Sequence, residues 1–115
     1  MMKKINSYIL EKLKINKDSK NSIDDEDIVL KDFIIHYLDN NYSLKYEKHY
    51  DLIFRVDEKN VKHIDIKFSN DIGNNIIANI NKVDLCQKIE KELSFDYYWS
   101  IDLKSKTISL SNTFI

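Results

Sequence analysis

An alternation of apolar and polar side chains runs through residues 50–68, which read YDLIFRVDEKNVKHIDIKF. On both sides of residues 57–60 most of the apolar side chains occupy even-numbered positions. A period of two is typical of a strand that buries one face, and the sequence Asp-Glu-Lys-Asn suits a type I turn with Asn60 in the left-handed region. We therefore predict an antiparallel hairpin in which residue 54 lies opposite 64, 52 opposite 66 and 50 opposite 68.

Three further strands are predicted outward from this hairpin. The alternation begins at Tyr42, so the first strand is expected to span residues 42–56. After a turn at residues 73–75, Ile76, Ala78 and Ile80 predict a third strand. A second hairpin closes the chain, with a turn at residues 105–106 and residue 101 opposite 110. Its inward side chains are expected to be Phe95, Tyr97, Trp99, Ile101, Leu103, Ile108, Leu110 and Phe114, which makes Trp99 a core residue.

Apolar residues at helical spacing predict three helices. The first spans residues 4–15, and the second spans residues 23–40 after a capping-box pattern at Ser22 and Asp25. The core stripe of the second helix is Leu30, Phe33, Ile34, Tyr37 and Leu38. Asp84 is expected to cap a third helix, whose stripe is Leu85, Cys86, Ile89 and Leu93.

The expected fold class is α+β, with the order α-α-β-β-β-α-β-β and an antiparallel five-stranded sheet covered by helices on one face. The chain has 115 residues, of which 43% are hydrophobic and 32% charged, so it fits one folded domain. We expect residues 1–21 to form an N-terminal helix and a polar connector, and residues 22–115 to form the α+β core.

The composition excludes several classes of site. One glycine, Gly73, and no proline argue against the phosphate-binding loops of P-loop, Rossmann and kinase folds. A single cysteine excludes an internal disulfide and a cysteine-based zinc site, and no signal peptide or membrane span is apparent, so we expect a cytoplasmic protein without a cofactor. One arginine, Arg55, beside 17 lysines disfavours sequence-specific DNA recognition.

Asp51, Asp65 and Lys67 are the catalytic candidates. In the predicted register Asp51 faces Lys67, and Asp65 lies diagonally on the same outer face. The set resembles the D...(D/E)-x-K signature of PD-(D/E)xK nucleases, which implies a divalent cation held by the two aspartates and a water oriented by the lysine. The sequence departs from that family in two respects. In the family the paired carboxylates lie on the second and third strands, whereas Asp51 and Asp65 fall on the first and second, and no proline precedes Asp51. Asp-x-Lys also occurs three more times, so a cross-strand ion pair on a solvated face is the favoured interpretation.

The histidines His36, His49 and His63 have no recognised metal spacing, and His49 and His63 fall on the outward side of the first hairpin. His36 is expected to form a surface pair with Asp32, four residues away on the helix. Cys86 lies on an apolar stripe and is expected to be a buried, inert thiol.

A protein-binding surface is predicted on the N-terminal helices. Residues 1–20 carry a net charge of +4 and residues 21–40 carry −5, which gives an orienting field for a partner. Ile28 and Ile35 form an apolar line that the core stripe does not require, so they contact either the first helix or a partner chain. The run Asp24, Asp25, Glu26 and Asp27 either complements the helix dipole or takes part in binding. These six residues are the candidate partner-binding site.

Three resemblances bear on function. Residues 5–17, INSYILEKLKINK, look like a leader found on small uncharacterised accessory proteins of low-GC gut bacteria and their phages. That resemblance implies a mobile-element protein that binds and blocks a host machine. The element order resembles double-stranded RNA binding domains, but Asp84 stands where a basic helix start is needed. It also resembles the topology of dimeric type III secretion chaperones. We expect a non-enzymatic protein-binding module with a host protein or a second copy as partner, and the alternatives are a metal-dependent nuclease and a dimeric chaperone-like module.

Overall fold

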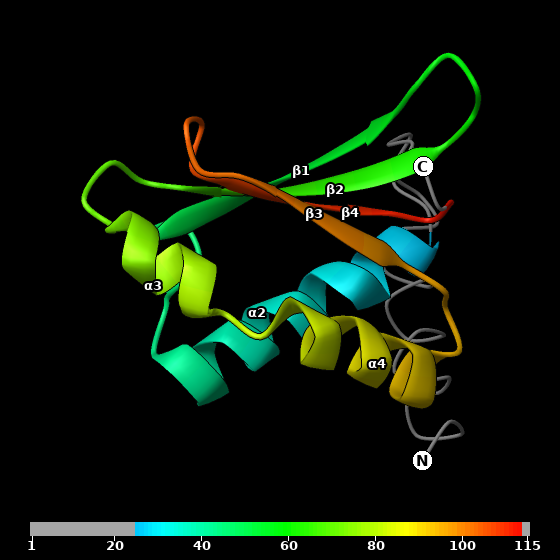
Figure 1. Ribbon diagram of the computed structural model, residues 1–115. Helices are drawn as coiled ribbons and strands as arrows, with labels where there is room; N and C mark the ends of the chain where they lie inside the picture. The colour runs from blue at the N-terminus through cyan, green and yellow to red at the C-terminus, as the bar shows by residue number, and fades with distance from the viewer. Residues whose placement is uncertain (1–24, 114–115) are drawn as a thin grey trace.

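A computed structural model describes residues 25–113 as two layers, a sheet and three helices that all lie against one of its faces (Figure 1). The elements in chain order are α2 (Asp25–Tyr42), β1 (Tyr50–Val56), β2 (Lys62–Phe68), α3 (Asn74–Asn79), α4 (Lys82–Leu93), β3 (Tyr98–Asp102) and β4 (Thr107–Ser111). The strand order is β1-β2-β4-β3, and every neighbouring pair is antiparallel. The α+β class is confirmed. The predicted helix at residues 4–15, Asp24 and Phe114 lie outside the described residues.

The first hairpin has the predicted register. Phe54 lies opposite Ile64, Leu52 opposite Ile66 and Tyr50 opposite Phe68. Asn60 has a φ of 66°, and its N–H donates to the carbonyl of Asp57 at 3.0 Å. The apolar pattern and the turn residues therefore determine the same pairing, as expected from a period of two.

The predicted strand at residues 42–56 is wrong in its first half. Helix α2 continues to Tyr42, and the chain turns at Ser43, whose φ of 56° is left-handed. The Ser43 N–H donates to the Asp39 carbonyl at 3.0 Å, and the Leu44 N–H donates to the Leu38 carbonyl at 3.2 Å. These bonds satisfy carbonyls at the helix end, so residues 43–49 form a connection in place of a strand.

The third predicted strand, at residues 76–80, is also wrong. Residues 76–79 belong to the short helix α3, which starts after Gly73, and Ile80 is the C-cap of this helix. Ile77 and Ile80 are buried, whereas Ile76 is 44% exposed, so burial follows the three-residue spacing of a helical turn. The described sheet therefore has four strands and not the five expected.

Helix α4 begins earlier than predicted. Its N-cap is Asn81, whose side chain accepts a hydrogen bond from the Asp84 N–H at 2.9 Å. Asp84 lies in the first turn and accepts a bond from the Tyr37 hydroxyl at 2.8 Å, which ties α4 to α2. Of the predicted stripe, Leu85, Ile89 and Leu93 are buried, whereas Cys86, also expected to be buried, is half-buried.

The second hairpin keeps the predicted parity but not the predicted register. Ile101 lies opposite Ile108, not residue 110, and Trp99 lies opposite Leu110. The prediction that Trp99 and Leu103 are core residues is wrong, because they are 41% and 37% exposed. Trp99 is on the inner side of the sheet, but β3 is an edge strand with no neighbour on its outer side among the described residues, and Leu103 follows β3 in the turn.

The core lies between the sheet and the helices. Helix α2 contributes five buried side chains, and Ile64, Ile66, Ile108 and Leu110 contribute from the two central strands. The buried residues of α2 are Val29, Leu30, Ile34, Tyr37 and Leu38. Val29 was not in the predicted stripe, and the predicted Phe33 is only half-buried at its edge. Burial of this apolar face is the main stabilising term of the fold.

Candidate functional site

The sheet face opposite the helices carries three rows of side chains, and no described helix covers it (Figure 1). The rows, read from β1 to β3, are Asp51, Lys67, Thr107 and Asp102; Ile53, Asp65, Ser109 and Ser100; and Arg55, His63, Ser111 and Tyr98. This outer face contains all three nuclease candidates and His63.

Asp65 is engaged by its neighbours. Arg55 donates from Nε at 2.7 Å and from its terminal nitrogen at 3.3 Å, and the Ser109 hydroxyl donates at 2.8 Å. Burial acts to raise the pKa of the Asp65 carboxyl, but the bonds from Arg55 and Ser109 outweigh it and hold the pKa below its usual value. A cation at Asp65 would have to compete with these bonds.

Asp51 and Lys67 face each other across the β1–β2 pair, as predicted, beside an open hollow of about 440 Å³. The hollow is lined by Glu47, Lys48, Tyr50, Asp51, Lys67, Phe68 and Ser69. Asp65 does not line it, and one Asp51 oxygen accepts the Leu52 N–H at 2.9 Å. Residues 25–113 contain no group of three or more acidic, histidine or cysteine side chains placed to hold a metal.

This geometry predicts no magnesium- or manganese-dependent cleavage of DNA or RNA by the purified chain. The physical reason is that Arg55 and Ser109 already occupy the Asp65 carboxylate, which does not line the hollow beside Asp51, whereas metal-assisted attack requires carboxylates free to hold the cation. Gel assays of wild type beside Asp65→Ala and Lys67→Ala test this. Cleavage that disappears in both variants while each keeps a native circular dichroism spectrum would contradict the prediction.

The sequence pattern placed His63 on the outward face but did not anticipate its burial. His63 is 6% exposed, and its Nε2 donates to the Asp57 carboxylate at 2.9 Å. Its Nδ1 lies 2.7 Å from the Ser111 hydroxyl. The order serine, histidine, aspartate matches that of a hydrolase triad, but Ser111 is only 7% exposed, and the hollow described above does not include it. The hydrogen-bonded chain of Asp57, His63 and Ser111 connects the turn between β1 and β2 to β4.

Asp57 gives this turn a defined response to acid. Hydrogen bonds from His63 and from the Val61 and Lys59 N–H groups lower the pKa of the Asp57 carboxyl from 3.8 to about 2. Because the folded state has the lower pKa, the ionised carboxylate contributes to stability above about pH 4, and this contribution is lost as the pH falls toward 2. Asp57→Asn should reduce the loss of stability in that interval, measured by urea unfolding at pH 5 and pH 2.5. Equal losses in both proteins would contradict this assignment.

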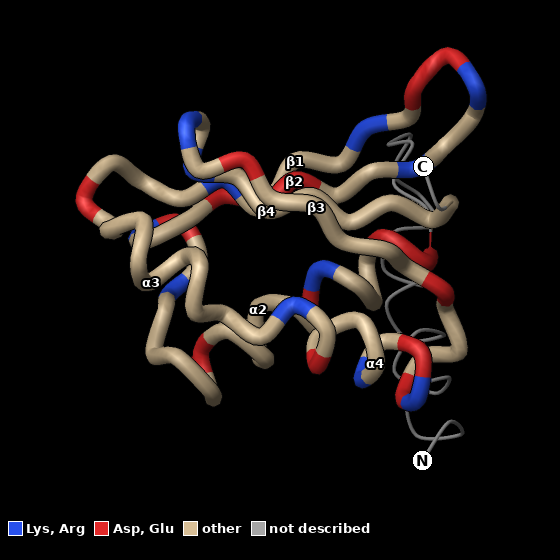
Figure 2. Tube along the Cα trace, in the orientation of Figure 1, with Lys and Arg blue, Asp and Glu red and all other residues tan. Residues whose placement is uncertain are grey.

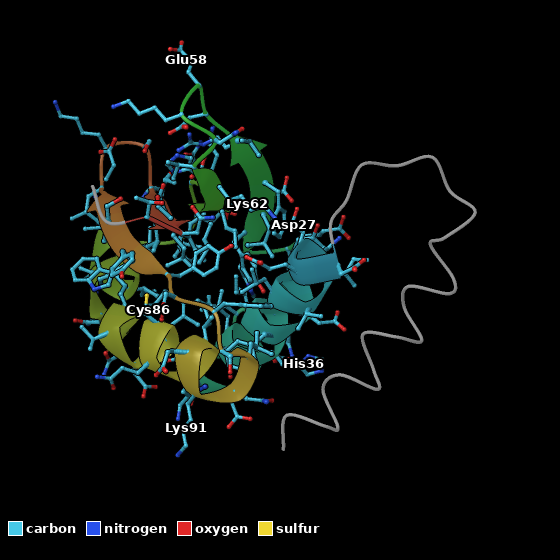
Figure 3. All side chains as sticks on the ribbon, turned by 90° about the vertical axis from the view of Figure 1, so that its right-hand side faces the viewer. Asp27, His36, Glu58, Lys62, Cys86 and Lys91 are labelled. Atoms are coloured by element: carbon cyan, nitrogen blue, oxygen red, sulfur yellow. The ribbon has the colours of Figure 1, made fainter. Side chains whose placement is uncertain are left out.

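The remaining histidines and the cysteine have local roles. The exposed His36 ring bonds to the Asp32 carbonyl at 2.9 Å, and the Lys45 N–H donates to His49 at 2.8 Å. Figure 3 shows His36 pointing away from α2 and Cys86 directed from α4 toward the sheet. Burial raises the pKa of the Cys86 thiol to about 11, so little reactive thiolate is present at neutral pH.

The predicted partner-binding residues on α2 lie near the sheet. Asp25 is exposed, whereas Ile28, Ile35 and Asp27 are half-buried, and Ile35 packs against the core. Glu26 accepts a hydrogen bond from the Tyr97 hydroxyl at 2.5 Å. Part of this surface therefore serves the contact between α2 and the segment before β3, and its role in binding stays a prediction.

The backbone hydrogen bonds identify a different surface. The Phe68 N–H donates to the Lys106 carbonyl, and the Asn112 N–H donates to the Lys62 carbonyl. The backbone N–H and C=O groups of the even-numbered residues of β4 therefore point toward β2. Because these groups alternate along an antiparallel strand, Thr107, Ser109 and Ser111 bond to β3. Their partners are Asp102, Ser100 and Tyr98. The N–H and C=O groups of Trp99 and Ile101 consequently point away from the sheet, at its free edge.

The opposite edge is closed over its first half. By the same alternation, the backbone N–H and C=O groups of the even-numbered residues of β1 point away from β2, at the edge of the sheet. The Tyr50 carbonyl accepts the Glu47 N–H at 2.8 Å, and the Leu52 N–H donates to the Asp51 carboxylate at 2.9 Å. Within the described part of the chain, no such bond closes the outward groups of Trp99 and Ile101. The first half of the β1 edge is thus protected, whereas the outward groups along β3 are open.

Aromatic side chains flank the open edge. Tyr98 on the outer face is 43% exposed, and Trp99 on the helix side is 41% exposed. The Lys82 ammonium lies 5.3 Å from the centre of the indole ring and donates to the Ile80 carbonyl at 2.8 Å. Lys82 therefore supports one side of the ring from α4 and leaves the rest accessible.

No charge interrupts residues 97–101, and Figure 2 shows β3 tan along most of its length. Charged side chains are a common device against edge-to-edge pairing, and β3 lacks them except for Asp102 at its end. We define the open edge as β3 with the outward backbone groups of Trp99 and Ile101.

Sequence reasoning missed this edge. Alternation indicates which face of a strand is buried, whereas edge position depends on strand order. The available signal was an uncharged run with two adjacent aromatics, Tyr98 and Trp99, between Asp96 and Asp102.

Comparison with protein-family models, curated proteins and solved structures gives no significant match to this chain. None of the helices in the described part of the chain is long and apolar enough to cross a membrane.

Proposed function

We propose that this protein is a non-enzymatic protein-binding module that pairs an extended segment of a partner protein with the open edge. The observation that supports this proposal is that the backbone N–H and C=O groups of Trp99 and Ile101 point outward at the edge of the sheet. A strand is the partner that matches such a row, because its own backbone groups repeat at the same spacing. Two such partner residues would satisfy four backbone groups of β3.

The side chains support the same assignment. A paired segment would lie beside Trp99 and Ile101 on the helix side and beside Tyr98 and Ser100 on the outer side. A matching sequence alternates apolar with polar residues. Trp99 is held by Lys82 before binding, which lowers the conformational entropy that association costs.

The biological setting follows from the sequence. The resemblance of residues 5–17 favours an accessory or inhibitory protein of a phage or mobile element that acts on a host protein, and the single cysteine favours a cytoplasmic one. Binding along an edge suits such a role, because it requires no catalytic residues in the inhibitor.

Substitution at the open edge tests the proposal. Trp99→Glu removes the exposed indole, adds a charge to the edge and retains a partner for Lys82, whereas Val56→Glu adds the same charge at the other edge, where Val56 is 59% exposed. Each tagged protein is incubated with lysate of a low-GC bacterium, and bound proteins are identified by mass spectrometry.

We expect the same partner on wild type and Val56→Glu and its loss from Trp99→Glu. Circular dichroism must show that both variants are folded. A partner retained equally by Trp99→Glu would refute the assignment of the site.

A further inference from the structure

We propose that β3 of a second copy of this chain occupies the open edge, which gives a two-fold symmetric dimer with a continuous eight-stranded sheet. This inference rests on the proposed function, since it names a partner for the same edge. Three properties of β3 support it: the direction of its backbone groups, its self-complementary register and the complementarity of its side chains.

The first property is the direction of the free backbone groups. Only Trp99 and Ile101 of β3 direct their N–H and C=O outward. When two copies of β3 run antiparallel, Trp99 of one copy meets Ile101 of the other, and the reciprocal pair forms across the axis. Each pair exchanges two hydrogen bonds, so the dimer satisfies all the outward groups of both strands.

The second property is the register. With Ser100 on the two-fold axis, residues 98–102 of both copies overlap over their full length. A shift by two residues in either direction would leave part of each strand unpaired, and one of these shifts would bring Asp96 opposite Asp102 of the other copy. The centred register is therefore favoured over its neighbours.

The third property is side-chain complementarity. In the centred register the helix-side pairs are Trp99 with Ile101, and the outer pairs are Tyr98 with Asp102. No like charges lie opposite each other, and the small side chain of Ser100 lies at the crowded axis. Helix-side residues meet helix-side residues, so the helices of both copies lie on the same side of the joined sheet. Val83, which follows Lys82 in α4 and is 51% exposed, lies on that side.

The centred register gives a sharp geometric test. Trp99 and Ile101 form the hydrogen-bonded pairs, so Ser100 faces its own copy in a non-hydrogen-bonded pair, where Cα atoms are about 4.5 Å apart. That separation permits a disulfide. The matched position at the closed edge is Ile53, the central residue of β1, which is on the outer face and 41% exposed.

The experiment uses the full chain with Cys86→Ala as background. Ser100→Cys and Ile53→Cys are oxidised with copper phenanthroline and analysed on non-reducing gels, and the mass of wild type is measured by light scattering over a concentration series. We expect Ser100→Cys to form a disulfide-linked dimer more than about tenfold faster than Ile53→Cys. Wild type should show a concentration-dependent dimer that Trp99→Glu lacks and Val56→Glu retains.

Equal cross-linking at both positions, or a wild type that stays monomeric throughout the series, would overturn the dimer. Faster cross-linking of Trp99→Cys or Ile101→Cys than of Ser100→Cys would overturn the register, because a shift by two residues places residue 99 or residue 101 on the axis. A monomeric wild type whose host partner is lost in Trp99→Glu would remove the self-association while leaving the proposed function standing. A dimer that still binds its host partner when Trp99 is replaced by Glu would refute the open edge as the host-binding site while leaving the self-association standing.

Discussion

Ile64→Ala is expected to lower the free energy of unfolding by about 2–5 kcal/mol, out of a total of about 5–15 kcal/mol for a domain of this size. Ile64 is 1% exposed and lies between Phe54 on β1 and Leu110 on β4. Truncation leaves a cavity in the central strands beneath the helices, and the neighbouring side chains are too constrained to fill it. Urea unfolding followed by circular dichroism measures the change.

Ile53→Ala is the matched control, because Ile53 lies on β1 opposite Asp65 but on the outer face. It is 41% exposed, and we expect its truncation to cost less than about 1 kcal/mol. Similar losses in the two variants would contradict the assignment of the core to the helix side of the sheet.

Asp51→Val is expected to open the protected first half of the β1 edge, so that both edges of the sheet can pair. The Asp51 carboxylate accepts the outward Leu52 N–H at 2.9 Å and also places a charge beside the edge. Without it, β1 presents a free donor in a strand that already carries the exposed Ile53 and Val56. Association through both edges does not close, so we expect species larger than a dimer and reduced solubility, measured by light scattering.

Asp51→Asn separates the two effects of the carboxylate. The amide oxygen still accepts the Leu52 N–H, but the charge is gone. If capping of the edge dominates, Asp51→Asn keeps the mass of wild type. An Asp51→Val protein with the mass of wild type would show that β1 is protected by other means, and the contrast between the two edges would then be wrong.

Local pattern was sufficient where one period and one turn agreed. In the first hairpin the alternation, the Asp57 turn and the left-handed Asn60 all indicate the same register, and Phe54 does lie opposite Ile64. In the second hairpin the parity was correct, but the pairing of Ile101 was displaced by two residues. A displacement of two keeps every side chain on its face, so the apolar pattern could not detect it.

Short segments were misassigned because two periods fit them equally well. In residues 76–80, Ile76, Ala78 and Ile80 fit the alternation of a strand, whereas Ile77 and Ile80 fit the spacing of a helical turn. Ile77 and Ile80 are the residues buried in the core, so the segment forms α3 and its C-cap. Tyr42 and Leu44 continue the alternation of the hairpin, yet α2 runs to Tyr42 and Ser43 turns the chain. Neither outcome can be read from spacing alone.

The candidate sites differ in how far the sequence could predict them. The face-to-face placement of Asp51 and Lys67 followed from the register, whereas the engagement of Asp65 by Arg55 and Ser109 depends on β4, which pairs from a distant part of the chain. The open edge depends on the full strand order and on the alternation of hydrogen bonds across three strands.

Amide hydrogen exchange at Trp99 and Ile101 measures whether a partner strand pairs with the open edge. NMR spectra of the isotopically labelled chain are recorded below and above the concentration at which it associates, or without and with a captured partner. We expect the Trp99 and Ile101 amides to exchange rapidly in the free protein and to become protected on association, while the outward Phe54 amide of β1 stays unchanged. Association that leaves both β3 amides unprotected, or that protects Phe54 instead, would contradict it.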